Sequence, residues 1–283
     1  MSERKNTRIV LTIAGSDSSG GAGIQADIKT ISALGLYACS AITAVTSQNT
    51  LGVKQIHPVP YSDVLFQIRA VMEDLEVNAI KIGMLFNEET THAVKDALKE
   101  ADFKGKIILD PVMQATSGAT LAQKQAIKTM TDELFPLADL ITPNLAEASL
   151  LCNMEQITDE EQMRQAALYI KNSLGAKQVL IKGGHLQNLF SRDIFLNSES
   201  VFLEFDSKKL ESRNTHGTGC TLSSAIASYC ALGHEMPVAI QKAKTFVYNA
   251  IENSMSLNLG KGHGSLNHFF NPQKLVVYED NRE

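Results

Sequence analysis

The chain has 283 residues, of which 44% are hydrophobic and 20% are charged, and its formal net charge is −5. This acidic balance argues against a nucleic-acid-binding protein, which would usually present a basic face. No segment approaches the roughly 18 uninterrupted apolar residues of a membrane span, and the first residues lack the long apolar core of a signal peptide. We therefore expect a cytoplasmic protein, with no nucleic-acid or membrane partner, whose four cysteines are reduced thiols.

Apolar segments of strand length alternate with segments of helical periodicity along the first two thirds of the chain. Strands are predicted at residues 9–14, 37–45, 79–82, 106–109, 140–142 and 178–181. Helices are predicted at residues 22–34, 62–75, 88–101, 122–134, 145–151 and 159–174. Several of the strands are apolar throughout, which is typical of a parallel sheet that helices cover on both faces.

The last third of the chain has a different pattern. Two short segments at 192–196 and 200–205 indicate a hairpin, and long helical patterns follow at 218–232 and 237–257. Repeats, low-complexity tracts and linkers are lacking in the sequence. We therefore predict a single α/β domain over residues 1–283, with a core at about 8–258 and a C-terminal tail at 259–283 that packs on the surface or frays.

A glycine-rich segment from Gly15 to Asp27 follows the first predicted strand and opens the first predicted helix. This is the usual place for a ligand in an open α/β sheet. The segment lacks the Gly-Lys-Ser/Thr of a phosphate-binding P-loop, and Ala26 stands where the last glycine or alanine of a dinucleotide fingerprint could stand. A tight strand-to-helix turn, in which the glycines only permit positive φ, is the alternative.

A second glycine turn, Gly217-Thr218-Gly219-Cys220, precedes a helix rich in small residues. Amides at a helix start converge on one point, which suits a phosphate or the charge that develops during its transfer. Because the helix dipole favours an anion there, we expect the pKa of Cys220 to be lowered, so that its thiolate can accept a proton. A glycine-capped helix with a small buried cysteine is the alternative.

Polar residues end three consecutive predicted strands. Asp110 follows the first, Asn144 and Glu147 follow the second, and Lys182 with two glycines follows the third. Carboxylates suit Mg²⁺, which binds through few protein ligands and keeps several waters. A lysine and glycine amides suit the phosphates of a nucleotide. A single carboxylate at a strand end more often caps a helix, but three such positions on one sheet edge favour a site.

Taken in order, these motifs resemble the ribokinase-like superfamily, and within it the hydroxymethylpyrimidine and hydroxymethylpyrimidine-phosphate kinases. The resemblance covers residues 9–257. It rests on Thr12 to Asp27, Ser47-Gln48-Asn49-Thr50, Lys81-Ile82-Gly83-Met84-Leu85, Asp110-Pro111-Val112-Met113, Thr142-Pro143-Asn144 with Glu147, Lys182-Gly183-Gly184-His185 and His216-Gly217-Thr218-Gly219-Cys220-Thr221. His185 and His216, which flank two of the glycine turns, are weaker candidates for contact with a nucleotide.

The resemblance implies a ribokinase-like fold, a homodimer, and transfer of phosphate from ATP with Mg²⁺ to a pyrimidine alcohol and then to its monophosphate. It also implies roles for individual residues. The implied catalytic group is Gly217, Thr218, Gly219 and Cys220, and the implied substrate pocket is Gln48, Gly15, Asp17, Met84 and Val112. The implied ATP site is Asn144, Glu147, Lys182, Gly183, Gly184 and Asp193, with Asp110 and Glu147 at the metal.

The pyridoxal kinases share nearly all of these motifs, so vitamin B6 salvage is the alternative activity. In many pyridoxal kinases a Met-Asp pair replaces Gln-Asn, and Gly-Ala-Gly-Cys replaces Gly-Thr-Gly-Cys. This chain has Gln48-Asn49 and Thr218, which resemble the thiamine branch. A thiazole kinase is a weaker alternative. A nicotinamide oxidoreductase would need the dinucleotide fingerprint, and a non-catalytic binding module would dispense with the carboxylates and the anion-binding turn.

Overall fold

The computed structural model describes residues 5–115, 118–184 and 190–279. Nine strands form one sheet in the order β10-β9-β8-β7-β6-β5-β2-β3-β4. Strands β3, β2, β5, β6, β7 and β8 pair in parallel with their neighbours in that order, whereas β4, β9 and β10 pair antiparallel. The strand bounds are β2 Ile9–Asp17, β3 Tyr37–Asn49, β4 Gly52–Pro58, β5 Val77–Ile82, β6 Lys106–Leu109, β7 Leu140–Ile141, β8 Val179–Ile181, β9 Phe190–Leu196 and β10 Phe202–Lys208.

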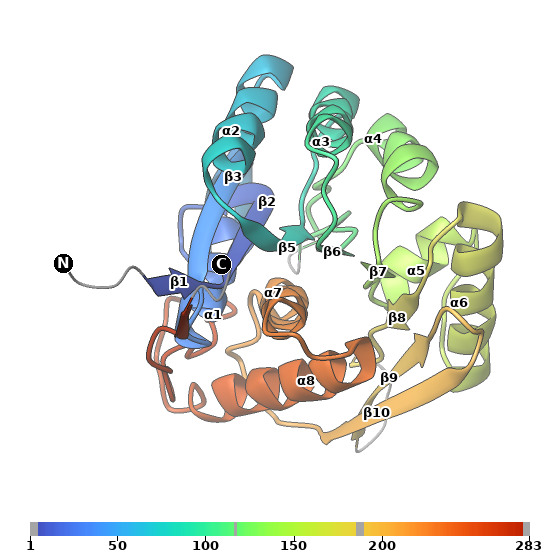
Figure 1. Cartoon of the computed structure of the whole chain (residues 1–283). Coiled ribbons are helices and arrows are strands. Elements are labelled where there is room, and N and C mark those ends of the chain that lie inside the picture. Colours follow the sequence, from blue (N-terminus) through green and yellow to red (C-terminus); the bar gives the residue numbers. More distant parts are fainter. Residues whose placement is uncertain (1–4, 116–117, 185–189, 280–283) are drawn as a thin grey trace.

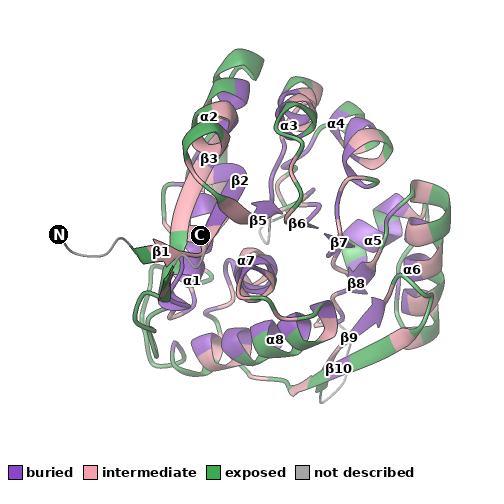
Figure 2. Cartoon of the chain, viewed as in Figure 1, coloured by how far each residue is buried: buried purple, intermediate pink, exposed green. Residues whose placement is uncertain are grey.

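Helices cover both faces of the sheet, as Figure 1 shows. The face that packs α1, α7 and α8 buries an apolar cluster around Ile226 and Ile240, and the opposite face buries one around Ile68 and Ile170. The helix bounds are α1 Gly23–Ala33, α2 Tyr61–Asp74, α3 Glu88–Glu100, α4 Lys124–Thr129, α5 Leu145–Leu151, α6 Glu160–Leu174, α7 Thr218–Ala231 and α8 Met236–Glu252. The buried residues of Figure 2 follow the strands and the inner sides of these helices.

The predicted α/β architecture is confirmed, and local chemistry explains several element boundaries. The Asp159 side chain accepts from the Gln162 amide at the start of α6, and Gly175 ends that helix in the left-handed region. The central strands carry fully buried apolar side chains such as Leu11 and Ile80. Within the described residues, no helix combines the length and apolarity needed to cross a membrane.

Three elements depart from the sequence predictions. Strand β3 continues to Asn49 and turns into the unpredicted β4, whose side chains are mostly half-buried or exposed because it is the sheet edge. The predicted helix 122–134 is α4 followed by a π-helical segment, Met130–Leu134. The last predicted helix ends at Glu252 rather than at residue 257.

The tail was expected to pack irregularly or fray, and its described part is better ordered than that. Strand β11, Val277–Glu279, pairs with β1, Lys5–Thr7, in a separate antiparallel ribbon. Leu266 and His268 are buried. The tail therefore contributes packed structure that the composition of the sequence does not reveal.

Candidate active site

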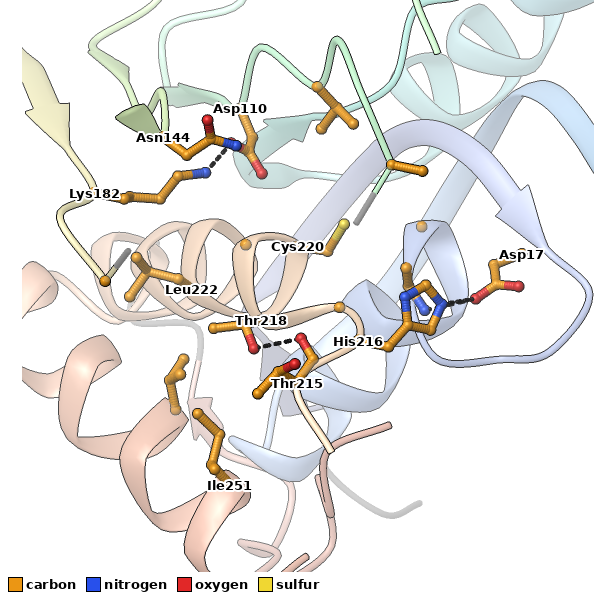
Figure 3. Close-up of a pocket in the computed structure, with 18 of the residues that line it drawn as sticks. Asp17, Asp110, Asn144, Lys182, Thr215, His216, Thr218, Cys220, Leu222 and Ile251 are labelled. Atoms are coloured by element: carbon orange, nitrogen blue, oxygen red, sulfur yellow. Dashed lines mark hydrogen bonds and ion pairs between the residues drawn. The ribbon is translucent and has the colours of Figure 1, made fainter. Parts of the chain in front are cut away.

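The candidate site is a cavity of about 580 Å³ along the carboxyl edge of the parallel strands. Strands β2, β5, β6, β7 and β8 end there, and the start of α7 closes one side. Figure 3 shows Asp17 and His216 at one end, Asp110, Asn144 and Lys182 at the other, and Cys220 between them. The volume lies within the roughly 300–1,000 Å³ of ligand pockets.

The glycine turn after β2 is organised by the Asp17 carboxylate. It accepts hydrogen bonds from the Ser19 amide and hydroxyl at 2.8 and 2.7 Å, and from the amides of Gly21 at 3.0 Å and Ala22 at 2.8 Å. His216 Nε2 lies 2.9 Å from Asp17 Oδ2. Burial alone would raise the pKa of Asp17, but His216 and these donors hold it well below its usual range. Asp17 is thus a fixed anion.

Gln48 lies at the same end of the cavity. Its amide Nε2 is 3.3 Å from His216 Nε2, and its backbone N–H donates to the Ser18 hydroxyl at 2.9 Å. Since His216 Nε2 is the nitrogen that faces Asp17, donation of its proton to that carboxylate leaves the Gln48 amide free to donate to a ligand. His216 therefore lies at the Gln48 end of the cavity, beside the glycine turn after β2.

Lys182 sits between two carboxylates at the opposite end. Its Nζ lies 2.7 Å from Asp110 Oδ1 and 3.9 Å from Glu147 Oε2. Burial opposes its charge, but the two carboxylates outweigh burial and raise the pKa of Lys182. Thr142 also donates to Asp110 Oδ1, at 3.1 Å. The three strand ends therefore converge, as their spacing in the sequence predicts.

Asn144 and Glu147 form a capping box at the start of α5. The Glu147 amide donates to Asn144 Oδ1 at 2.9 Å, and the Asn144 amide donates to Glu147 Oε2 at 2.7 Å. Burial, together with Asp110, raises the pKa of Glu147 to about 7 despite Lys182. The helix-cap alternative is thus realised in the structure, while both side chains still line the cavity.

The expected thiolate at Cys220 is wrong. Cys220 stands in the first turn of α7 and lines the cavity. Burial raises its pKa to about 11, and neither the nearby Lys81 nor the Gly23 amide compensates. The side chain is half-buried and faces the cavity, and its desolvation outweighs the favourable helix start, which favours the thiol over the thiolate.

Asp193 in β9 lines the cavity and contacts the residue that follows Lys182. Its Oδ1 accepts the Gly183 amide at 2.9 Å, and its Oδ2 lies 2.5 Å from Lys244 Nζ of α8. Gly183 itself does not line the cavity, and a Cβ there would clash with the Arg192 carbonyl. Asp193 therefore connects the hairpin, the Lys182 turn and α8.

The other predicted residues lie together in the cavity. Those lining it are Gly15, Asp17, Gln48, Met84, Asp110, Val112, Asn144, Glu147, Lys182, Gly184, Asp193, Gly217, Thr218, Gly219 and Cys220. His185 lies outside the described residues. Within the part of the chain that the structure describes, no three Asp, Glu, His or Cys side chains are grouped as a metal site.

Sequence reasoning gave no role to several parts of the lining, including the segment at residues 207–212, at and after the end of β10. Lys81 in β5 is fully buried and reaches Asp27 Oδ2 at 2.8 Å; a lysine inside an apolar strand is the signal that could have found it. The face of α8 with Lys244, Val247 and Ile251 also lines the cavity. Its spacing indicates one helical face, but nothing in the sequence says that a cavity lies opposite.

Comparison with known proteins identifies the family. The model of the phosphomethylpyrimidine kinase family matches residues 17–267. The chain belongs to this family. It is 45% identical over 263 residues to the hydroxymethylpyrimidine/phosphomethylpyrimidine kinase of Rhizobium meliloti, with 93% of this chain and 97% of that protein covered. The kinase of the same name from Haemophilus influenzae is 46% identical over 267 residues, covering 93% and 97%.

A longer relative has the same segment. The thiamine biosynthesis bifunctional protein of Geobacter sulfurreducens is 48% identical over 260 residues, which are 92% of this chain and 52% of that protein. The chain thus spans about half of the bifunctional protein and nearly all of the kinases above. The chain is a phosphotransferase of this kinase family.

Solved structures of two kinds of kinase share the fold. The phosphomethylpyrimidine kinase of Clostridium difficile is 41% identical with a TM-score of 0.75, covering 86% of this chain and 99% of that chain. A pyridoxal kinase of Staphylococcus aureus, solved with AMP-PCP and pyridoxal, is 30% identical with a TM-score of 0.84, covering 97% and 99%. The ribokinase-like fold and ATP as substrate follow from this family.

Proposed function

We propose that the protein transfers phosphate from ATP to 4-amino-5-hydroxymethyl-2-methylpyrimidine and then to the resulting monophosphate, for thiamine biosynthesis. The observation that carries the proposal is one cavity with an amide at one end and a lysine between two carboxylates at the other, in a chain of the phosphomethylpyrimidine kinase family. The amide end suits the ring, and the charged end suits the triphosphate.

The ring is proposed to bind between Gln48, Met84 and Val112, with Gly15 beneath it. Gln48 offers both a donor and an acceptor to the ring nitrogens and its exocyclic amine. A Cβ at Gly15 would approach Met84 Sδ at 2.9 Å, so a larger residue would narrow this end. Asp17 takes part by holding the turn and His216 in place.

Phosphoryl transfer is proposed at the start of α7. The turn at 217–219 and Cys220 form the start of α7, where helix amides without an intrahelical partner can stabilise the charge that develops without reorganisation. Lys182, with Asn144 and the turn at 183–184, is proposed to hold the phosphates. Cys220, as a neutral thiol, is proposed to face the reacting alcohol and to donate weakly to it.

Mg²⁺ fits the carboxylates at this end. Asp110 and Glu147 supply two oxygen groups, and Mg²⁺ commonly binds through one or two carboxylates plus substrate phosphates and water. When bound, the ion would neutralise charge on the transferred phosphate. Asp110 and Glu147 would hold it, beside the Lys182 ammonium.

The experiment is a panel of acceptors with ATP and Mg²⁺, followed by coupled detection of ADP. We expect phosphorylation of the pyrimidine alcohol and of its monophosphate. Pyridoxal and pyridoxine are the matched competitors, because the pyridoxal kinases of Staphylococcus aureus and Bacillus subtilis share the fold at 30–34% identity. A far higher kcat/KM for pyridoxal would overturn the assignment. Vitamin B6 salvage would then replace it.

Three further properties belong to the same proposal. We propose that residues 1–283 form one kinase domain, that the protein works in the cytoplasm, and that it forms a homodimer. The four free cysteines support a reducing compartment, and the net charge of −5 is consistent with no nucleic-acid partner. Exposed apolar side chains on β3 and α2, such as Val45 and Phe66, support self-association. Light scattering would measure the mass in solution.

A further inference from the structure

The tail segment at residues 260–268 contacts the turn between β3 and β4. The Gly262 amide donates to Thr50 Oγ1 at 3.1 Å, and the His263 amide donates to the Thr50 carbonyl at 3.0 Å. Thr50 is two residues beyond Gln48, which is proposed to read the ring. The tail therefore binds the turn that carries the ring end of the cavity.

The same segment also contacts the loop that leads into α7. The His216 amide donates to the Gly264 carbonyl at 3.0 Å, and the Gly264 amide donates to the Arg213 carbonyl at 3.2 Å. His216 and Ser265 form an isolated parallel bridge. The tail thus contacts two segments about 165 residues apart in sequence that both border the Gln48 end of the cavity.

A third contact links the tail to the turn 217–219 through Thr221. His268 is buried, and its Nε2 lies 2.9 Å from Thr221 Oγ1. The Thr221 hydroxyl donates to the Gly217 carbonyl at 2.8 Å, and the Thr221 amide donates to the same oxygen at 2.9 Å. Gly217 has a left-handed φ of 88° at the start of α7, so Thr221 connects His268 to the residue at which the chain turns into the helix.

The packing of the segment leaves no room for a side chain at two of its glycines. A Cβ at Gly262 would clash with the Thr50 carbonyl, and a Cβ at Gly264 would clash with the Asn214 side chain. The Asn214 amide also donates to the Leu257 carbonyl at 2.9 Å, which anchors the tail where it leaves α8. Figure 1 shows the C-terminal part of the chain on the side of α1. Residues 262–268 therefore contact the rest of the domain at several points along the segment.

We propose that residues 260–268 form a strap that sets the distance between the ring-reading turn and the phosphate-binding turn, with Thr50 and His268 as positioning residues. Neither side chain lines the cavity. The strap rests on the proposed function, since the acceptor must span from Gln48 to Gly217. A displacement of about 1 Å between reacting groups can cost about 10²-fold in rate. The tail would thereby contribute to catalysis without touching the substrate.

The first test compares Gly262→Ala with the matched control Gly233→Ala. Gly233 has a φ of 87° and nothing near its missing Cβ, so alanine there strains the backbone far from the strap. We expect Gly262→Ala to lower kcat/KM for the pyrimidine alcohol about 10- to 100-fold, with the KM for ATP unchanged. Gly233→Ala should lower the Tm and leave kcat/KM unchanged. Equal kcat/KM values in the two variants would overturn the strap.

The second test uses milder variants, in case Gly262→Ala fails to fold. Thr50→Val removes the hydroxyl that accepts the Gly262 amide, and Thr50→Ser keeps it. We expect a loss of acceptor kcat/KM in Thr50→Val and its rescue in Thr50→Ser, each measured well below the Tm. A loss of Tm alone would assign Thr50 to stability and refute the strap. Wild-type enzyme that does not phosphorylate the pyrimidine would refute the proposed function instead.

Discussion

Replacing Cys220 tests how the enzyme handles the proton of the acceptor alcohol. With a pKa of about 11, about one side chain in 10⁴ is a thiolate at pH 7, which corresponds to about 5 kcal/mol at 1.36 kcal/mol per pKa unit. That cost offsets the roughly 10²- to 10⁴-fold gain of positioned base catalysis. We therefore expect Cys220 to act as a neutral thiol within the anion-binding turn.

The expected result differs between two variants. Cys220→Ala removes a weak donor, so kcat should fall about 10- to 100-fold, at or below the lower end of the 10²- to 10³-fold loss for a stronger oxyanion donor. Cys220→Ser restores a hydroxyl donor and should recover most of this loss. Cys152→Ala is the matched control, because Cys152 is a free thiol that does not line the cavity. It should keep the wild-type kcat.

The assay is kcat at saturating ATP and acceptor between pH 7 and pH 9. A neutral donor predicts no Cys220-dependent slope, because both pH values lie below a pKa of about 11. A thiolate base with a pKa of about 11 predicts a kcat that rises about tenfold per pH unit in the wild type and stays flat in Cys220→Ala. That slope, together with an inactive Cys220→Ser, would refute the neutral-thiol reasoning.

Gln48→Ala should raise the KM for the pyrimidine about 5- to 150-fold, for a loss of roughly 1–3 kcal/mol, while the KM for ATP is unchanged; steady-state kinetics with each substrate measures this. Lys182→Met should weaken ATP binding by about 10-fold or more, because loss of the ammonium leaves Asp110 and Glu147 to repel the phosphates and costs about 1.5–3 kcal/mol; titration with a non-hydrolysable ATP analogue measures it. The pKa of Glu147 near 7 means that its carboxylate is lost as pH falls through 7, so the wild-type Mg²⁺ requirement should rise between pH 8 and pH 6. Glu147→Gln should show a high Mg²⁺ requirement at both pH values, and a wild-type Mg²⁺ titration would assign Glu147 to the helix cap alone.

The convergence of the strand ends could be predicted because it follows from topology. Asp110, Asn144 and Lys182 each follow an apolar strand, and parallel neighbours end at one sheet edge. The cap geometry at Asn144 could also be predicted as an alternative. The sequence could not decide whether a helix cap at Asn144 and Glu147 excludes a ligand site formed by the same side chains.

Other features depend on packing that no local pattern encodes. Strand β4 has few buried side chains, and the sheet edge is defined by its pairing with β3. The sequence predicted a lowered pKa for Cys220, whereas burial raises it. Position at a helix start is a local property, but burial depends on every element around the sulfur. The tail appeared irregular because its contacts to Thr50 and His216 run largely through backbone groups and glycines.

Glu147 shows why a structural role and a functional role can occupy one side chain. Its carboxylate accepts the amides of Asn144 and Met113, which uses two of about four acceptor positions on an ionised carboxylate. The remaining positions face Lys182 and the cavity. The capping box fixes the rotamer before any ligand arrives, so less conformational entropy is lost when the phosphates bind. A cap that holds Glu147 in place therefore supports the proposed metal site, and the burial that raises its pKa to about 7 makes the charge of that site depend on pH.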